Sequence, residues 1–195
     1  MPAAEAGCRQ SLGDWDSATT TQESEPVYHC VMAPETLVRP YEALAESLHP
    51  TGSRDQRMQL VVDTLFEALK ETGVSWVGFY QDRPGEPDER RLVLGPCRDK
   101  PACSPIGLDG VCGKALLSRR PQIVLDIRDL GAAYIACDPS DRSEIVIPLA
   151  EQGGRCWGVL DLDSHDVAGF DESDERGLSL VLQAASFQTH QPPDC

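Results

Sequence analysis

The chain has 195 residues, of which 41% are hydrophobic, and a formal net charge of −15. This length allows one domain with its own core plus an extension, and no segment approaches the ~20 apolar residues of a membrane-spanning helix. The acidic excess disfavours nucleic acids and anionic membranes as partners, because like charges repel. Residues 1–10 lack the basic start and apolar run of a secretory signal, so we expect a cytoplasmic protein.

Composition divides the chain into three parts. Residues 1–40 are acidic and rich in alanine, serine, threonine and proline, and we predict that they form a disordered extension. Residues 41–188 alternate between helix and strand patterns and are predicted to form a single domain. Residues 189–195 are expected to be a frayed tail.

The first predicted element is a helix that begins after Ser53, repeats apolar residues at helical spacing and stops at Gly73. Two strands follow. The first is rich in β-branched and aromatic residues, and the second is rich in leucine. A long loop with several prolines and glycines then leads into a short helix. In order, these segments are the strands at 74–80 and 91–94, the loop at 95–110 and the helix at 111–118.

The second half of the domain adds strands, another long loop and a last helix. The strands at 144–149 and 155–162 are joined by a Gly-Gly pair at 153–154, which is a hairpin signal. Asp171 begins the last helix, with Asp174 three residues later as in a capping box. The remaining segments are a strand at 122–125 and a loop at 126–142.

This order of elements predicts an α+β fold: a mainly antiparallel sheet with the N- and C-terminal helices on one face and the loops enclosing a pocket on the other. Since side chains alternate along a strand, Asp161 and Asp163 point to one face, about 6.5–7 Å apart. Glu144 on the neighbouring strand can join them under the loops. Acidic residues on one sheet face are also typical of a wet surface, and this alternative stays open.

Cysteine is frequent, with eight residues in the chain. Cys97, Cys103 and Cys112 lie in or beside the first long loop, and Cys137 lies in the second. Cysteine on a polar loop is harder to explain by packing than Cys156 on a strand, which slightly favours redox chemistry over an inert role. No CxxC pair occurs, so a zinc site is the third choice.

Six ordered blocks stand out in the domain: LVLGP at 92–96, KPAC at 100–103, GVCG at 110–113, IACD at 135–138, SEIVIP at 143–148 and GVLDLDS at 158–164. Together with WVGFY at 76–80, these blocks resemble the free methionine-(R)-sulfoxide reductase family. The resemblance runs from residue 41 to residue 187. It implies a GAF fold, in agreement with the α+β prediction, and a catalytic role for the domain at 41–188.

The resemblance also implies an activity, the reduction of free L-methionine-(R)-sulfoxide to methionine by an oxidoreductase. Cys137 would be the attacking cysteine, and Cys103 and Cys112 would resolve the intermediate as an intramolecular disulfide that thioredoxin reduces. The residues that match the family's substrate pocket are Glu144, Asp161, Asp163, Trp76 and Tyr80. We expect no cofactor and no metal, and a homodimer is one oligomeric state that the sequence leaves open.

Elementary chemistry agrees with these roles. A sulfoxide oxygen leaves poorly unless it is protonated, and crowded carboxylates raise at least one pKa, so that a neutral acid can supply the proton. The remaining negative charge suits the ammonium group of a free amino acid. Acidic neighbours of Cys137, in particular Asp138 and Asp141, disfavour its thiolate. Either Arg142 offsets them, or the thiol loses its proton only after the substrate binds.

Two features depart from the family pattern. Eight residues separate Cys103 from Cys112, one fewer than in the family, and Cys97 stands where the family has an aromatic residue. The choice of resolving cysteine among these three is therefore open, as is the carboxylate that gives up the proton. Two rival functions also stay open: a GAF module that senses a small molecule without chemistry, and a regulator that binds metal through the loop cysteines and His165.

Overall fold

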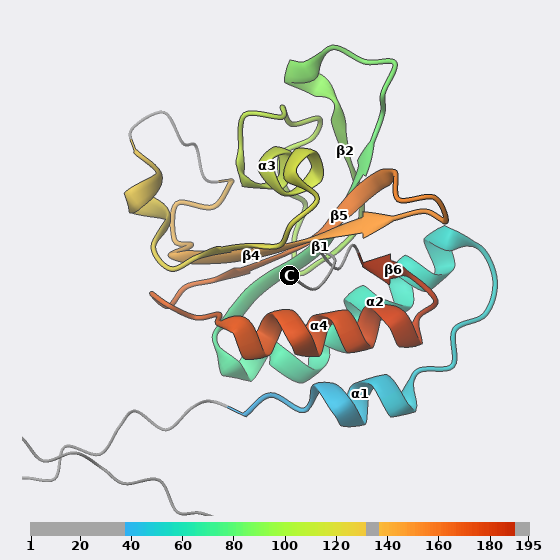
Figure 1. Cartoon of the computed structure of the whole chain (residues 1–195). Helices are drawn as coiled ribbons and strands as arrows, with labels where there is room; N and C mark the ends of the chain where they lie inside the picture. The colour runs from blue at the N-terminus through green and yellow to red at the C-terminus, as the bar shows by residue number, and fades with distance from the viewer. Residues whose placement is uncertain (1–37, 132–136, 190–195) are drawn as a thin grey trace, which may run out of the picture. The chain divides into compact units, whose positions relative to one another are not determined.

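The structure is a computed structural model that describes residues 38–131 and 137–189 (Figure 1). The acidic extension predicted at 1–40 lies outside the described residues, except for its last three positions. Residues 190–195 of the predicted tail and the Ile135-Ala136 part of the fourth sequence block also lie outside them.

An antiparallel sheet forms the centre of the domain, which confirms the predicted α+β fold. Its neighbouring strands run in the order β2-β1-β5-β4-β3, and β6 pairs with β4. All five predicted strands are present with shifted ends, and β6 is an additional short strand. The strands are β1 (Val74–Asp82), β2 (Leu92–Arg98), β3 (Gln122–Val124), β4 (Ser143–Ala150), β5 (Cys156–Ser164) and β6 (Gln188–Thr189).

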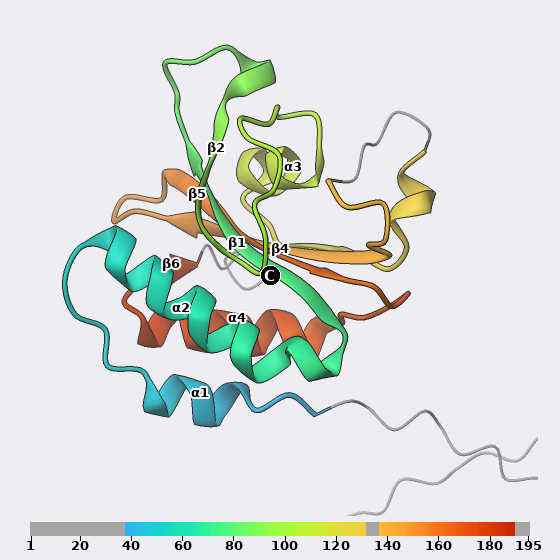
Figure 2. The same cartoon turned by 180° about the vertical axis from the view of Figure 1, so that it is seen from behind.

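Helices lie on both faces of the sheet, in unequal numbers. Helices α1, α2 and α4 are stacked below one face, and α3 lies alone over the other (Figures 1 and 2). Their bounds are α1 (Tyr41–Ser47), α2 (Arg54–Leu69), α3 (Val111–Ser118) and α4 (Glu172–Ala184), and short 3₁₀ turns occupy Lys70–Thr72, Asp88–Arg90 and Ile127–Leu130. The single helix α3 leaves room on its face of the sheet for a cavity.

The two long helices begin where the sequence predicts. Ser53 caps α2 in a capping box with Gln56, and Asp171 caps α4 in a capping box with Asp174. Each box satisfies backbone N–H groups that the first helical turn leaves unpaired. Gly73 follows α2 and its 3₁₀ turn with a positive φ of 90°, the left-handed conformation that favours glycine.

Helix α1 was not predicted from the sequence. It has only seven residues, and Pro40 at its N-cap position makes no side-chain hydrogen bond to the first turn. The local signals for a helix are therefore weak. Its place is determined by packing: the buried Tyr41 hydroxyl donates to Asp174 Oδ1 at 2.8 Å. The ring of Tyr41 also lies so close to Gly177 that a Cβ there would sit 2.1 Å from it. Tertiary contacts with α4 therefore stabilise this short helix.

The strand alternation predicted from the sequence divides the core into two layers. Ile145, Ile147, Leu160 and Leu162 belong to the apolar cluster that contains the helices α2 and α4. Val146, which lies between Ile145 and Ile147 on β4, belongs to a second cluster. This cluster contains Trp76, Tyr80 and residues of α3. The second, smaller layer surrounds the face on which the predicted acidic residues lie.

Strand β2 extends four residues beyond its predicted end. The sequence predicts a loop from Gly95 onward, because glycine and proline interrupt strands. In the structure, Gly95, Pro96 and Cys97 continue the strand to Arg98, and the register with β1 shifts between Gly78 and Tyr80. Because β2 is an edge strand, Pro96 is tolerated there. The prediction that Cys97 lies on a loop is therefore wrong.

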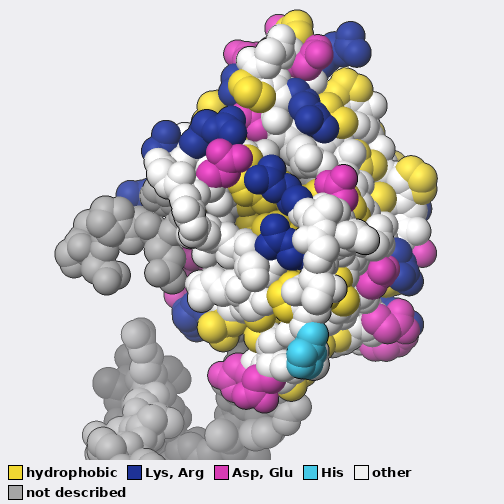
Figure 3. All heavy atoms as spheres, turned by 90° about the vertical axis from the view of Figure 1, so that its right-hand side faces the viewer, with side chains coloured by type: hydrophobic (Ala, Val, Ile, Leu, Met, Phe, Trp, Pro, Cys, Tyr) yellow, Lys and Arg dark blue, Asp and Glu magenta, His cyan; other side chains and the backbone are white. Residues whose placement is uncertain are grey.

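The acidic excess does not form a uniform negative surface. On the face seen in Figure 3, basic and acidic side chains are interspersed, with hydrophobic ones between them. A dense group of carboxyl side chains instead lies inside the domain, on the α3 side of the sheet.

Candidate active site

A cavity of about 400 Å³ opens on the α3 face of the sheet, a volume typical of small-molecule sites. Strands β1, β4 and β5 form its floor, and α3 with the loop before it forms one wall. Seven of the eight residues predicted for the site line it, namely Trp76, Tyr80, Cys112, Cys137, Glu144, Asp161 and Asp163. Asp141 lines it as well.

The three predicted acidic residues meet on this floor. Glu144 on β4 is opposite Asp163 on β5, and Asp161 is opposite Val146, two residues along from Glu144. Glu144 and Asp161 are buried, with 4% and 6% of their surface exposed. The alternative of a wet sheet face is therefore wrong.

Burial makes these carboxyl groups unusually weak acids. The pKa of Asp161 is raised well above its usual value, first by burial and then by the charge of Glu144. The pKa of Asp163 is raised in the same way, first by burial and then by the charge of Asp161. Crowded, buried carboxylates cannot all ionise cheaply, so part of the cluster holds protons at neutral pH. The site can therefore offer a neutral carboxylic acid as a proton donor.

Asp141 extends the acidic cluster toward the second loop. Its Oδ1 atom accepts a hydrogen bond from Ser75 Oγ at 2.8 Å, and burial raises its pKa. The sequence analysis gave Asp141 no part in the pocket and did not single out Ser75. Asp141 lies in a loop whose path cannot be derived from the sequence pattern.

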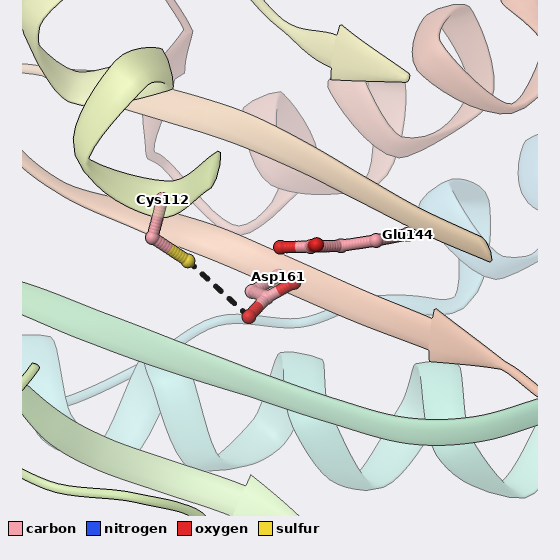
Figure 4. Close-up of side chains that lie close together, drawn as sticks. All are labelled: Cys112, Glu144 and Asp161. Atoms are coloured by element: carbon pink, nitrogen blue, oxygen red, sulfur yellow. Dashed lines mark hydrogen bonds between the residues drawn. The ribbon is translucent and has the colours of Figure 1, made fainter. Parts of the chain in front are cut away.

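Cys112 lies in the first turn of α3 and is buried against the acidic cluster (Figure 4). Its thiol donates a hydrogen bond to Asp161 Oδ2 at 3.3 Å. Burial, followed by the nearby charges of Asp161 and Glu144, raises the pKa of this thiol well above its usual value. The loop before α3 packs tightly against the helix at Gly113, where a Cβ would lie 2.2 Å from the carbonyl oxygen of Leu108. Cys112 is therefore a protonated thiol at neutral pH.

Cys137 and Cys103 come together from the two long loops. Both are exposed; Cys137 lines the cavity, whereas Cys103 is not among its lining residues. Burial of its sulfur and a hydrogen bond with the Cys103 side chain raise the pKa of Cys137 to about 12, and the charge of Asp163 contributes. At neutral pH, Cys137 is therefore a thiol beside a second thiol and within the electrostatic reach of the acidic cluster.

Two aromatic residues of β1 hold the Cys103 loop in place. Trp76 Nε1 donates to the carbonyl oxygen of Lys100 at 2.8 Å, and the Tyr80 hydroxyl donates to the carbonyl oxygen of Cys103 at 2.9 Å. Their ring centroids are 6.1 Å apart. The indole of Trp76 covers Gly78, where a Cβ would lie 2.1 Å from the ring. The aromatic wall predicted from the sequence therefore also positions a cysteine.

The sequence suggests Arg142 as the cation that offsets the acidic neighbours of Cys137, but the cation that pairs with one of these neighbours is Lys100. Arg142 forms an ion pair with Asp126 Oδ2 at 3.3 Å. Lys100, which the sequence analysis assigned no role, forms an ion pair with Asp138 and lowers the pKa of that carboxyl to about 2. The pair connects the loop that carries Cys103 with the loop that carries Cys137.

The remaining cysteines of the described chain, Cys97 and Cys156, do not line the cavity. Cys97 Sγ is 3.6 Å from the carbonyl oxygen of Lys100. Cys156 is buried on β5, as expected of a structural residue.

Two groups of side chains among the described residues could hold a cation. The donor atoms of Cys112, Glu144 and Asp161 lie within 4.8 Å of one another, as do those of the group Asp138, Asp141 and His165. The loop cysteines and His165, which the metal-binding alternative needs together, form no such group in the part of the chain that the structure describes.

Comparisons with known proteins decide the family. The model of the GAF domain family matches residues 52–187. The free methionine-R-sulfoxide reductase of Saccharomyces cerevisiae is 41% identical over 111 residues, which cover 56% of this chain and 60% of the yeast protein. The free methionine-R-sulfoxide reductase of Escherichia coli is 40% identical over 122 residues, which cover 61% of this chain and 68% of that protein.

A solved structure agrees with these relatives. The free methionine-R-sulfoxide reductase from Neisseria meningitidis in complex with its substrate is 34% identical and superimposes with a TM-score of 0.61, covering 74% of this chain and 81% of that one. The chain belongs to the free methionine-R-sulfoxide reductase family of GAF-domain proteins. Five of the six sequence blocks that carry the resemblance, and the segment WVGFY at 76–80, contribute residues to the lining of the cavity, whereas LVLGP at 92–96 contributes none. Within the described residues, none of the helices is both long and apolar enough to cross a bilayer.

Proposed function

We propose that the protein is an oxidoreductase that reduces free L-methionine-(R)-sulfoxide to L-methionine. The observation that supports this most strongly is the cavity itself, which Cys137 lines together with a cluster of acidic residues. A nucleophilic sulfur and a neutral proton donor that line the same small pocket are the two groups that sulfoxide reduction requires.

In the first step, the oxygen atom passes from the substrate to Cys137. Asp161 or Asp163, whose raised pKa keeps a proton available, protonates the sulfoxide oxygen. The Cys137 sulfur forms a bond to this oxygen as the substrate S–O bond breaks, and the thiol proton returns to the carboxylate. Methionine sulfur gains two electrons and Cys137 loses two, so the products are methionine and a cysteine sulfenic acid.

In the second step, a neighbouring thiol resolves the sulfenic acid. Cys103 is in hydrogen-bonding contact with Cys137, so its thiol is placed to form a disulfide while water leaves. Cys112 is on the acidic floor and is the second choice. Thioredoxin then reduces the disulfide by thiol–disulfide exchange and restores both thiols. The electrons come from thiols throughout, and the cycle needs no cofactor.

Selectivity for the free amino acid follows from charge. Glu144, Asp161 and Asp163 leave net negative charge in the cavity, which attracts an ammonium group. Methionine sulfoxide in a protein has an amide at this position and lacks that charge. The apolar body of the side chain is expected to pack against Trp76 and Tyr80, which form the aromatic wall.

There are two explanations for how the Cys137 thiol can lose its proton among acidic neighbours. Its high pKa favours the second, in which the proton leaves only after the substrate binds. Arg142 is engaged with Asp126, and a thiol with a pKa of about 12 does not ionise by itself at neutral pH. The substrate brings an ammonium group into the cluster, and its sulfoxide oxygen takes up a proton. Cys137 is therefore deprotonated during the reaction, after the substrate has bound.

The proposal is tested by coupling the protein to thioredoxin, thioredoxin reductase and NADPH. We expect NADPH consumption with free L-methionine-(R)-sulfoxide, and little with the S epimer or with methionine sulfoxide in a protein. The alternative, a GAF sensor without chemistry, predicts flat NADPH traces with all three substrates. Direct measurement of methionine by chromatography separates reduction of the substrate from oxidation of thiols by air.

A further inference from the structure

We propose that Cys112, Glu144 and Asp161 form a binding site for Zn²⁺ in the reduced protein, and that the bound ion excludes the substrate. The three side chains come from three different elements, α3, β4 and β5, and point into one space on the floor of the cavity (Figure 4). Binding of the ion stands independently of the proposed function, whereas exclusion of the substrate rests on it.

The donor atoms lie close enough together to hold one ion. They lie within 4.8 Å of one another, and Cys112 Sγ is 3.3 Å from Asp161 Oδ2. Bond lengths of ~2.3 Å for Zn–S and ~2.1 Å for Zn–O at a tetrahedral angle put sulfur and oxygen about 3.6 Å apart. The Cys112–Asp161 pair is therefore within a few tenths of an ångström of the spacing that a bound ion requires, and the other two pairs lie within 4.8 Å.

One oxygen atom of Asp161 shows that the site lacks a partner. Oδ1 is buried and has no hydrogen-bond partner among the described residues, although only 6% of the Asp161 surface is exposed. Buried polar atoms without partners are rare and unfavourable, and they often mark a missing ligand. Cys112 contacts only the other oxygen, Oδ2, so an ion that this carboxylate binds through Oδ1 would supply the missing partner.

The ligand set selects the kind of ion. One thiolate and two carboxylates combine a soft with two hard donors, which suits borderline Zn²⁺ and disfavours Mg²⁺ and Ca²⁺, which prefer oxygen alone. The three protein ligands leave the fourth position open toward the cavity, where a water molecule can complete the shell. On binding, the Cys112 thiol proton is released to solvent and the Zn–S bond forms, so no electrons are transferred.

Exclusion of the substrate follows from shared ligands. Glu144 and Asp161 belong to the cluster that we assign to the ammonium group of methionine sulfoxide. A dication on these carboxylates removes the charge that attracts the ammonium group and fills the space beside it. The ion therefore acts as a reversible competitor of the free amino acid.

The test must separate this site from the exposed thiols. Cys103 and Cys137 are in contact and can bind metal themselves, so both are first changed to serine. In this Cys103→Ser/Cys137→Ser background, Co²⁺ serves as the spectroscopic probe, because a thiolate bound to it absorbs in the near ultraviolet. Zn²⁺ affinity is measured by displacement of the Co²⁺ signal. Cys156→Ser, which alters a buried cysteine outside the cavity, is the matched control.

We expect the background protein to bind one Co²⁺ with a thiolate band that Zn²⁺ displaces and Mg²⁺ does not. Adding Cys112→Ser should abolish the band, and adding Asp161→Asn should weaken Zn²⁺ binding by more than about tenfold, whereas adding Cys156→Ser should change neither. A background protein without the band, or a band that persists after Cys112→Ser, would overturn the site. The Asp161→Asn variant keeps the outcome decisive if Cys112→Ser fails to fold.

Exclusion is tested in the same background with free methionine, which cannot react. Methionine should weaken Zn²⁺ binding in proportion to its concentration, and an unchanged affinity at saturating methionine would refute the competition. These measurements need no turnover. A failure of the reductase assay with intact metal binding would therefore count against the proposed function and not against the metal site.

Discussion

Cys137 and Cys103 are in contact at the edge of the cavity, but only Cys137 lines it. This difference predicts different phenotypes for the two thiols. Cys137→Ser should form no methionine, because serine cannot accept the oxygen atom. Cys103→Ser should release about one equivalent of methionine per chain and then slow, because the first step is intact and its resolution is not.

Methionine released from free L-methionine-(R)-sulfoxide per chain, followed with and without thioredoxin, measures both effects. Cys156→Ser is the control and should turn over as the unmodified protein does. Sustained turnover by Cys103→Ser would assign resolution to another thiol, with Cys112 the next candidate.

The substitution Asp161→Asn should lower the activity of the protein and raise its stability. The Oδ1 atom of Asp161 is buried and finds no hydrogen-bond partner in the part of the chain that the structure describes, and the charged form of the side chain is disfavoured by burial. Asp161→Asn removes a proton donor and should lower the rate by about 10²-fold. At neutral pH this carboxyl is ionised in the unfolded chain but held protonated in the folded protein, so Asp161→Asn removes a cost of folding and should raise Tm by about 2–4 °C for each kcal/mol gained.

The stability effect has a definite pH dependence. The pKa of Asp161 is higher in the folded than in the unfolded protein, so its contribution is fully present below the unfolded pKa and is lost as pH rises through the folded pKa. The Tm difference between Asp161→Asn and the unmodified protein should therefore grow from acid toward alkaline pH. Asp129→Asn, at an exposed position on a 3₁₀ turn, is the control and should show no such trend. A difference that shrinks with rising pH would contradict the assignment.

Single residues also show how far the sequence can be interpreted. Strand alternation places Asp161, Asp163 and Glu144 on one face, because the two-residue period is a property of every strand. The partner of Arg142 and the role of Lys100 could not be derived in this way. Both depend on where two loops meet, and no periodic signal encodes the path of a loop.

The ion pair between Lys100 and Asp138 joins the two cysteine-bearing loops, and we predict that it speeds disulfide formation. Lys100→Met should leave methionine formation in a single turnover unchanged and slow the closure of the disulfide. Exposed ion pairs contribute about 0.2–1 kcal/mol, so the rate should fall by no more than about fivefold. The charge reversal Lys100→Asp with Asp138→Lys should restore part of the rate.

Rapid quenching followed by mass spectrometry of alkylated cysteines separates the two steps. Lys70→Met, which breaks an exposed ion pair with Glu67 away from the cavity, is the matched control. The effect of Lys100→Met should fade at high salt, where the pair is screened. Equal closure rates at low salt in Lys100→Met and the unmodified protein would disprove the role.

Elements with strong local signals were predicted well, and elements defined by their partners were not. Helices α2 and α4 have both caps and periodicity, and α3 begins and ends where expected. Helix α1 is stabilised by α4, the two-residue strand β6 pairs with β4, and the last part of β2 continues only because β1 offers hydrogen-bond partners. Such contacts are non-local, so a short sequence window contains no sign of them.

At the scale of the molecule, Arg39 connects the start of the described chain with distant parts of the domain. Its guanidinium donates to Asp174 Oδ1 at 2.7 Å, to Thr72 Oγ1 at 3.0 Å and to the Thr72 carbonyl oxygen at 3.0 Å. It also stacks on Phe170, with 5.1 Å to the ring centroid. Arg39 is buried, although the sequence analysis placed it in the extension.

Loss of this residue should therefore destabilise the whole domain. Arg39→Ala leaves the buried Asp174 without its cation, and we expect a loss of about 3 kcal/mol in the free energy of unfolding. Urea unfolding followed by tryptophan fluorescence measures it. Arg90→Ala, at an exposed position, should stay within about 0.5 kcal/mol of the unmodified protein. A similarly small change for Arg39→Ala would show that the network does not hold the domain together.

The account as a whole depends on the transfer of an oxygen atom to Cys137. The most direct measurement uses Cys103→Ser/Cys112→Ser, in which a sulfenic acid cannot be resolved by its neighbours. After reaction with free L-methionine-(R)-sulfoxide and dimedone, peptide mass spectrometry should find about one dimedone adduct per chain on Cys137, together with an equal amount of methionine. The S epimer should give neither. Methionine without an adduct on Cys137, or an adduct on Cys97 or Cys156 in its place, would contradict the account.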